Sequence, residues 1–302
     1  MYINPYEAIN GEGEWLRGNF HTHAGTGEGT CGHYPIETVA DSYRDCGYKV
    51  LTISNHDIYS DTSGLSEALG MTLINGFEFS SDSHMLCLNT RSWIDDGVHQ
   101  TVIDETNKQG GIVVICHPRW HDGNYWTAEE ILKLRGVSGM EIYNGVIFRM
   151  DGSGLATDVW DSVLSAGRLV WGYANDDFHR WYDLAKAWNM IYSAPGVEAV
   201  VNALRQGCFY ATTGLELADF SLNGDIIHVA ARMRSGYAQA LEYAFIGKDG
   251  EILAVVNDPA DSDSGAAYRI KPNQPYIRVR ICSPFGAMLW TQPVYDSNFL
   301  TS

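Results

Sequence analysis

Short apolar runs rich in β-branched residues alternate with stretches of helical spacing along the first two thirds of the chain. Such runs are typical of buried strands, and apolar residues that recur every three or four positions are typical of amphipathic helices. Strand followed by helix, repeated, predicts a parallel sheet with crossover helices. The strand-like runs are 49–54, 71–79, 85–88, 112–116, 140–143, 169–173 and 188–192.

Several of the helical stretches carry start or stop signals. Pro35 is a favourable first helical residue, and Gly47 can end the helix that follows it. Thr127 and Glu130 have the spacing of a capping box, which predicts a helix through Leu134. The remaining helical stripes lie at 98–103, 155–164 and 197–204, and each is closed by a later glycine.

The pattern changes after Gly214. Helical stripes give way to short strand-like runs at 220–222, 226–231, 241–246, 252–256, 276–281 and 288–291. Turn-forming residues separate them at 223–225, 248–250, 261–265 and 284–286. Many short strands between turns predict a small antiparallel β-sandwich. We therefore expect two domains, an α/β domain at 1–213 and a β-sandwich at 214–302.

Candidate chemical groups gather at the ends of the apolar runs before Gly214. His21 and His23 lie on one side of an extended segment, so both imidazoles can face one metal ion. The other candidates follow or end later runs: His56, Glu78, His84, His117, Asp177 and His179. In a (β/α) barrel the carboxyl ends of the strands form the rim on which sites are built. This repeated placement favours a barrel over an open sheet.

The candidates combine imidazoles with carboxylates. These groups suit zinc, manganese or iron, whereas calcium prefers an all-oxygen ligand set. Four ligands usually fill one tetrahedral site, so this larger set implies two or three divalent ions, with a carboxylate bridging a pair. Such a cluster lowers the pKa of bound water and clamps both oxygens of an in-line displacement, the usual way to cleave phosphate esters. No thiolate ligand is evident.

The composition limits which binding partners and which cellular location we expect. The formal net charge of −17 argues against nucleic-acid binding, which needs a basic face, yet it allows a small anionic substrate held by metals. The six cysteines are scattered without zinc-knuckle or disulfide spacing. No signal peptide or membrane-length apolar run is present. We expect a cytoplasmic protein, unless a leader has been removed, with no membrane partner and an oligomeric state left open.

The ordered motifs resemble those of the polymerase and histidinol phosphatase (PHP) superfamily. The resemblance rests on Arg17-Gly18, His21-Thr22-His23, Ile53-Ser54-Asn55-His56-Asp57, Gly76-Phe77-Glu78, His84, His117-Pro118 and Asp177-Phe178-His179. Further strings look like the branch that includes the carbaryl hydrolase type of metallohydrolase: 141–145, 209–214, 276–279 and 290–293. The resemblance implies an α/β fold, a distorted (β/α)7 barrel of PHP type, here followed by the small C-terminal antiparallel β-sandwich.

The resemblance also implies up to three metals. The ligands of the first would be His21, His23, Glu78 and Asp177. Glu78 would bridge to a second, completed by His84 and His117. A third would be held by His56, His179 and a residue of the loop after His23.

The loop after His23 departs from the family pattern. The family usually has Ser-Asp-Gly there, whereas this chain has Gly27-Glu28-Gly29. Glu28 is therefore the expected third-site ligand, although a solvated loop carboxylate is an equal alternative. His33 is a nearby substitute and is otherwise a surface histidine.

Other residues beside the motifs have assignable roles. Glu78 and Asp177 are catalytic candidates, joined by Asp57 as an orienter of a histidine or a proton donor. Arg119 and Arg180 can fork onto a phosphate or a carboxylate, or simply form salt bridges. Glu141 is either a polar residue of the barrel mouth or a buried hydrogen-bonded carboxylate. Aromatic residues that can wall a pocket or fill the core are Trp120, Tyr125, Trp126, Phe178, Trp181 and Tyr182.

These features predict a metal-dependent hydrolase, with phosphoesterase the favoured activity. It would act on a small phosphate ester through a metal-bridged hydroxide, so that no serine or cysteine nucleophile is needed. A carboxyl-ester, carbamate or amide hydrolase that uses the same cluster is the alternative enzyme. A non-catalytic binding protein with structural metals is the third possibility, and so complete a ligand set argues against it.

Overall fold

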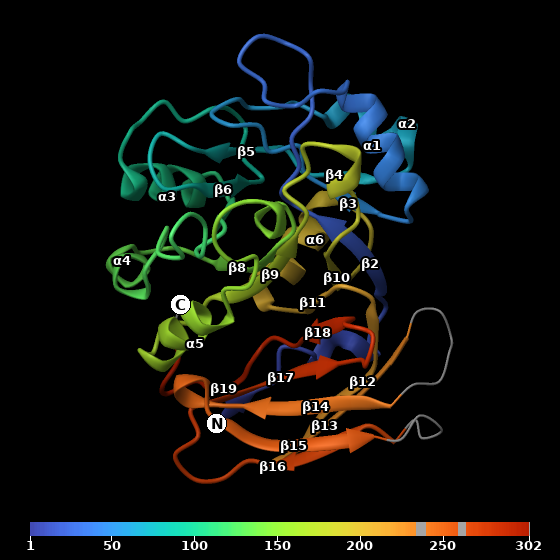
Figure 1. Cartoon of the computed structure of the whole chain (residues 1–302), viewed down its shortest axis with the longest axis vertical. Coiled ribbons are helices and arrows are strands. Elements are labelled where there is room, and N and C mark those ends of the chain that lie inside the picture. The colour runs from blue at the N-terminus through green and yellow to red at the C-terminus, as the bar shows by residue number, and fades with distance from the viewer. Residues whose placement is uncertain (234–239, 259–263, 302) are drawn as a thin grey trace.

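The computed structural model describes residues 1–233, 240–258 and 264–301. Figure 1 shows an upper body that carries the helices and a lower body made mainly of strands. The described residues form six α-helices: α1 (Ile36–Asp45), α2 (Ser63–Leu69), α3 (His99–Lys108), α4 (Ala128–Lys133), α5 (Thr157–Ser165) and α6 (Val197–Gln206). No helix among these residues has the length and apolar character needed to cross a membrane, and the cytoplasmic location stays a prediction.

The helical signals in the sequence are confirmed. α1 begins directly after Pro35, and α6 ends at Gly207, which adopts the left-handed conformation that a C-terminal glycine provides. The capping box before α4 is present: Thr127 Oγ1 accepts from the Glu130 amide at 3.2 Å, and Glu130 Oε2 accepts from the Thr127 amide at 2.8 Å. α2 was not anticipated, because this short helix has no buried residue and therefore no apolar stripe.

One sheet runs through both bodies. Its strands are β1 (Tyr2–Ile3), β2 (Glu14–Asn19), β3 (Val50–Leu51), β4 (Thr72–Leu73), β10 (Trp188–Ser193), β11 (Phe209–Thr212), β14 (Leu241–Ile246), β15 (Ile252–Asp258), β17 (Tyr276–Cys282), β18 (Met288–Trp290) and β19 (Val294–Asp296). Their order is β1-β19-β17-β18-β11-β10-β2-β3-β4, and β14 joins at β17 with β15 beyond it. Only β2, β3 and β4 are paired in parallel among these described strands.

A second sheet completes the upper body. It contains β5 (Gly76–Phe79), β6 (Met85–Leu88), β7 (Ile112–Ile115), β8 (Gly139–Asn144) and β9 (Trp171–Asn175). β7, β8 and β9 are parallel, as the sequence predicted. β6 is instead antiparallel to both β5 and β7. For β5 and β6 the reason is the connection, because residues 80–84 alone join them and this is too short for a parallel crossover.

Isolated bridges join these sheets in the upper body. Thr22, after β2, pairs with Phe178, after β9, and His56 pairs with Glu78 of β5. We call the line defined by these two bridges the seam. Because single bridges rather than continuous ladders connect the sheets, they are not closed, and the predicted (β/α)7 barrel is not confirmed. The fold is a mixed α/β arrangement with few helices.

The lower body is a β-sandwich. A three-stranded sheet of β12 (Leu215–Asn223), β13 (Ile226–Met233) and β16 (Ala266–Arg269) packs against the layer that contains β14 and β17. Side chains from both layers share one apolar core, to which Leu217, Val229, Phe245 and Val279 contribute. The expected turn at 261–265 lies partly outside the described residues, which resume at residue 264.

The two bodies are joined by backbone and side-chain contacts. β11 pairs with β18, so sheet hydrogen bonds cross the boundary expected at Gly214. Arg278 of β17 forms a buried bidentate ion pair with Asp161 of α5, with Nε–Oδ1 at 2.7 Å and Nη2–Oδ2 at 2.5 Å. The Gln292 side chain exchanges two hydrogen bonds with the Gly172 backbone, at 2.9 and 2.8 Å. The division into 1–213 and 214–302 stays a prediction.

Candidate metal centre

The seam brings together residues from the ends of different strands. His21 and His23 follow β2, Glu78 lies in β5, His117 follows β7 and Asp177 follows β9. Two of them have a left-handed backbone, with φ of 30° at His117 and 54° at Asp177. Residues other than glycine rarely adopt this backbone conformation, and backbone strain of this kind clusters at functional sites. The backbone therefore marks the seam as the candidate site.

Glu78 is fully buried at the centre of the cluster. Its Oε2 lies 3.2 Å from His21 Nε2 and 3.3 Å from His23 Nε2. Its Oε1 lies 2.9 Å from His84 Nδ1 and 3.3 Å from His117 Nε2. The two oxygens of one carboxylate thus face different sets of imidazoles, which is the arrangement that a carboxylate bridging two ions requires.

Asp177 completes the first of these two sets. Its Oδ1 lies 3.3 Å from His21 Nε2 and 3.2 Å from His23 Nε2. Its Oδ2 accepts a hydrogen bond from Asn144 Nδ2 at 3.2 Å. Because Asn144 holds the second oxygen, Oδ1 stays directed at the two histidines. Two imidazole nitrogens and two carboxylate oxygens, the second from Glu78, therefore converge on one point.

Glu141 orients the ligands from behind. Its Oε1 accepts from His21 Nδ1 at 2.9 Å, and its Oε2 accepts from the His117 backbone N–H and from Asn144 Nδ2, both at 2.8 Å. A hydrogen on His21 Nδ1 leaves Nε2 with a lone pair that faces Glu78. Glu141 is buried, so of the two roles considered for it the structure supports the hydrogen-bonded structural carboxylate.

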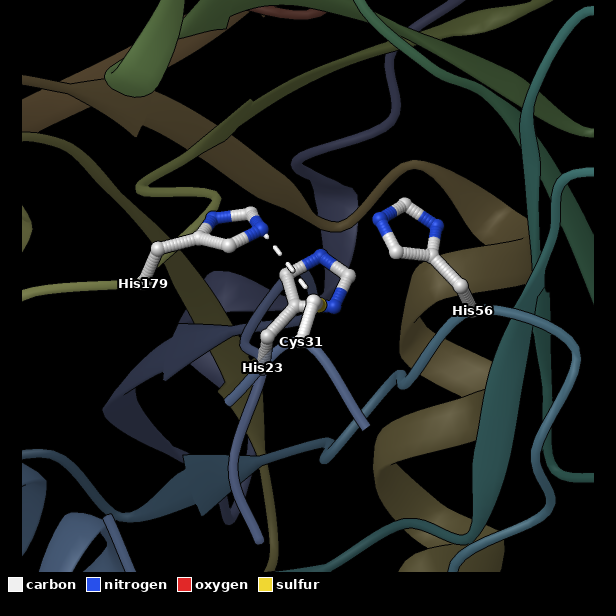
Figure 2. A group of neighbouring side chains, drawn as sticks. All are labelled: His23, Cys31, His56 and His179. Carbon is white, nitrogen blue, oxygen red and sulfur yellow. Dashed lines mark hydrogen bonds between the residues drawn. The ribbon is translucent and has the colours of Figure 1, made fainter. Parts of the chain in front are cut away.

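A third group lies on the other side of His23. It consists of His23, Cys31, His56 and His179, whose potential ligand atoms all lie within 4.8 Å of one another. Figure 2 shows the rings of His56 and His179 on opposite sides of His23 and Cys31. The Cys31 Sγ lies 3.5 Å from His179 Nε2. His56 also reaches the central carboxylate, with its Nδ1 2.8 Å from Glu78 Oε2.

The loop after His23 differs from the sequence expectation. Glu28 is exposed at the tip of this loop and belongs to none of the ligand groups formed by the described residues. The Thr30 hydroxyl, which donates to the carbonyls of Gly25 and Gly27 at 3.1 and 2.7 Å, closes a turn that leaves Glu28 in solvent. Cys31, next along the chain, returns to the cluster instead. The only signal for Cys31 in the sequence is its place in a glycine-rich loop near His23.

Bound metal ions would satisfy polar atoms of the cluster that have no hydrogen-bond partner among the described residues. Several buried atoms of the cluster have no hydrogen bond of normal geometry to a described residue, among them His21 Nε2, His23 Nε2, Glu78 Oε2 and Asp177 Oδ1. Each such orphan costs about 1–3 kcal/mol. Two ligands that are each about 2.1 Å from a tetrahedral ion lie about 3.4 Å apart, close to the separations observed here. An ion would therefore satisfy atoms that the chain leaves unpaired.

The electrostatics of the cluster point the same way. Burial opposes the protonation of His21, but Asp177 and Glu78 outweigh burial and raise the pKa of this imidazole well above its usual value. Burial would raise the pKa of Glu78, but His21 and His56 outweigh it and hold that pKa well below its usual range. Burial also opposes ionisation of Cys31, yet hydrogen bonding to His179 and its neighbours lowers the thiol pKa to about 4. Without metal, the carboxylates therefore favour the protonated form of His21, and the imidazoles favour the ionised form of Glu78.

Two further catalytic candidates have other partners. The Asp57 carboxylate accepts from the Ser80 backbone N–H at 2.9 Å and from its hydroxyl at 2.6 Å, and it has no hydrogen bond to a histidine of the described residues. Arg119 forms a salt bridge with Asp158 and donates to the Gly123 carbonyl at 2.6 Å, so its guanidinium is already engaged. Arg180, beside His179, is half-buried and forms no ion pair with an acidic residue in the described ranges.

Some of the aromatic residues flank the cluster and others are core. The rings of Trp120 and Tyr125 have centroids 4.9 and 5.2 Å from that of His117, and both residues are partly exposed. Trp181 and Tyr182 are exposed on the His179 side. The two remaining members of the set, Trp126 and Phe178, are buried in the core. Aromatic surfaces therefore border the candidate site on two sides.

Comparison with known proteins gives a likeness in fold. No family model matches the chain, and no curated protein matches it. Its structure is similar to the crystal structure of a two-domain protein from Bacteroides vulgatus that contains a predicted PHP-like metal-dependent phosphoesterase. The alignment covers 93% of this chain and 95% of that chain, with a TM-score of 0.55 and 15% sequence identity. It shows a shared two-part fold and does not support the carbaryl hydrolase branch in particular.

Proposed function

We propose that this protein is a divalent-metal-dependent hydrolase of the PHP type, and that its reaction is the hydrolysis of a small phosphate ester. The observation that carries the proposal is the buried Glu78 carboxylate, whose two oxygens face different imidazoles: His21, His23 and His56 at Oε2, and His84 and His117 at Oε1. The likeness in fold to a protein that contains a predicted PHP-like metal-dependent phosphoesterase supports the same class. We also propose that the two sheets of the upper body, which the seam links, correspond to a distorted barrel of the PHP type.

The ligands divide between two ions around Glu78. His21, His23, Asp177 and Glu78 Oε2 would hold one ion. His84, His117 and Glu78 Oε1 would hold the other. Zinc, manganese and iron all suit such a mixture of imidazole and carboxylate. When bound, these ions supply Lewis acidity and lower the pKa of water.

The chain itself prepares the site for this chemistry. Glu141 and Asn144 fix the orientation of the ligands before any ion arrives. Trp120 and Tyr125 border the site with apolar surface, which limits the access of water. Arg180 is the arginine available to a substrate anion, because Arg119 is paired with Asp158. The net charge of −17 favours a small anion over a polyanion such as DNA.

Glu78→Gln is the decisive variant. It keeps the shape of the side chain but removes the charge that two ions would share. We expect loss of most bound metal, measured by elemental analysis, and a fall in turnover of at least about a thousandfold, roughly 4 kcal/mol. Glu67→Gln, an exposed site on α2, is the matched control and should change neither quantity. Near-normal metal content and turnover in Glu78→Gln would refute the proposal.

The reaction class is tested with substrate panels on the metal-loaded protein. Turnover of phosphomonoesters or phosphodiesters with little activity on carboxyl esters and carbamates is the expected result. Activity confined to carboxyl esters, carbamates or amides would replace the phosphoesterase proposal with the alternative hydrolase. Stoichiometric metal without turnover of any panel member would favour a binding protein with structural metals.

A further inference from the structure

Cys31 occupies a position in the cluster that the proposed pair of ions does not use. Its Sγ lies 3.5 Å from His179 Nε2, and the ligand atoms of His23 and His56 complete the group within 4.8 Å (Figure 2). His179 Nδ1 donates to the Asp177 backbone carbonyl at 2.9 Å. The hydrogen on Nδ1 leaves His179 Nε2 as the lone-pair nitrogen, and this is the atom that faces the sulfur.

His23 provides an independent sign of a missing ligand. This side chain is fully buried, and neither Nδ1 nor Nε2 has a hydrogen bond of normal geometry to a described residue. Its ring lies between those of His56 and His179, with centroid distances of 4.5 and 4.3 Å. Asp177 and Glu78 approach only its Nε2. The orphaned Nδ1 is a buried donor or acceptor that the protein alone does not satisfy.

The backbone around Cys31 is held in place. The Gly25 N–H donates to the Tyr34 carbonyl at 2.7 Å, which closes the loop at its base. Gly32 lies so close to Ala24 that a Cβ would stand 2.6 Å from the Ala24 backbone, so no larger residue fits there without a shift. The Asn55 side chain exchanges two hydrogen bonds with Ala24, at 3.0 and 2.8 Å. These contacts fix the loop, and Cys31 with it, against the cluster.

We propose that Cys31 is a thiolate ligand of a further metal ion, held together with His56 and His179 and adjoining His23, and that this position prefers a thiophilic ion such as zinc or cobalt over manganese or magnesium. Thiolate and imidazole are the softer ligands, whereas the pair around Glu78 mixes imidazole with hard carboxylate oxygen. On binding, the ion takes the place of the proton that Cys31 Sγ and His179 Nε2 share, and this proton passes to solvent. The inference rests on the proposed metal centre but not on the identity of the substrate.

Cobalt(II) reports thiolate ligation directly, because a sulfur-to-cobalt charge-transfer band in the near ultraviolet appears only when sulfur is bound. We expect the full chain, titrated with cobalt after chelation, to show this band. Cys31→Ala and Cys31→Ser should lose the band and one equivalent of bound cobalt, while the remaining equivalents persist. Cys31→Asp should keep the equivalent without the band and shift its preference toward manganese.

Three variants serve as controls for this experiment. Cys46→Ser removes a half-buried thiol outside the cluster and should leave band and stoichiometry unchanged. Cys116→Ala removes the buried thiol near His21 and should also leave the band. Glu28→Ala tests the carboxylate expected from the sequence and should have no effect. A band that survives Cys31→Ala, or that disappears only in Cys116→Ala, would overturn the assignment.

The outcomes separate this inference from the proposed function. A stable two-equivalent centre that lacks the band would refute thiolate ligation and leave the hydrolase proposal intact. A Cys31-dependent band in a protein that turns over no phosphate ester would support the inference and refute the proposed reaction. Labelling adds a readout independent of spectroscopy: zinc should protect Cys31, but not Cys46, from alkylation mapped by mass spectrometry. Equal labelling of Cys31 with and without zinc would count against the proposal.

Discussion

The seam of the upper body and the core of the sandwich bury opposite kinds of side chain. The seam buries carboxylates and imidazoles together, among them His21, His23, Glu78 and Asp177. The sandwich core is apolar, and its neighbouring charged pair, Arg278 with Asp161, lies where the sandwich meets α5. Burying charge is costly unless every group is paired. The buried charges of the seam are therefore suited to bind a ligand, whereas the Arg278–Asp161 pair fixes the sandwich to α5.

Removal of the sandwich should have the largest effect on the fold. In a chain that ends at residue 213, β11 loses its pairing with β18, and Asp161 loses Arg278. The exposed edge of β11 leads us to expect aggregation or loss of cooperative unfolding. Size-exclusion chromatography and thermal denaturation against the full chain check this. A monomeric, cooperatively folded truncation with normal metal content would show that the upper body is independent of the sandwich.

Loss of one partner at the junction should be smaller but still severe. Arg278→Met leaves Asp161 buried without its cation, and we expect a loss of about 3–5 kcal/mol in unfolding free energy. Arg269→Met removes the partner of the exposed Asp225 and should cost at most about 1 kcal/mol. Metal content should be unchanged in both variants. Denaturant unfolding measures the difference, and equal losses would mean that burial at the junction is unimportant.

Glu141→Gln sharpens the comparison at the seam. The variant keeps the size of the side chain but weakens its hold on His21 Nδ1. We expect metal affinity to fall by about 10- to 100-fold, with the fold retained. The reason is that a residue that hydrogen-bonds to a metal ligand orients that ligand but does not itself bind the ion. Competition with a chelator gives the affinity, and Glu129→Gln on the exposed face of α4 is the control. An unchanged metal affinity would mean that Glu141 stabilises the fold but does not orient the metal ligands.

The smallest effect concerns pH in the metal-free protein. Despite burial, carboxylates raise the pKa of His21, and Glu78 raises that of His56 to about 9. Raised imidazole pKa values stabilise the folded state below about pH 6.5, and this stabilisation is lost as the pH rises toward 9. The lowered pKa of Glu78 acts in the other direction, since its contribution is lost in acid below about pH 4.5.

We therefore expect the thermal midpoint of the metal-free protein to fall between about pH 6.5 and 9. The gap to the zinc-loaded protein should widen over the same range, because zinc takes over from the lost protons. Thermal denaturation of chelated and reconstituted samples at several pH values measures this gap. A gap that is independent of pH would mean that protonation of the imidazoles does not substitute for the ions.

The sequence by itself determined the local elements and most members of the cluster. The capping box at Thr127 and the glycine after α6 act within a single turn, so they are legible without a fold. The histidines and carboxylates at strand ends were equally legible, because apolar runs define where strands stop. Their convergence on Glu78 follows once those ends meet at the seam.

The tertiary structure alone decided the partners that depend on distant backbone. Glu28 and Cys31 lie in one short loop, and which of them reaches His179 depends on a turn closed by Thr30 and on the packing of Gly32 against Ala24. The unclosed sheets and the Arg278–Asp161 junction likewise arise between segments remote in sequence. Periodicity records which face of an element is buried, but it carries no information about which other element covers that face.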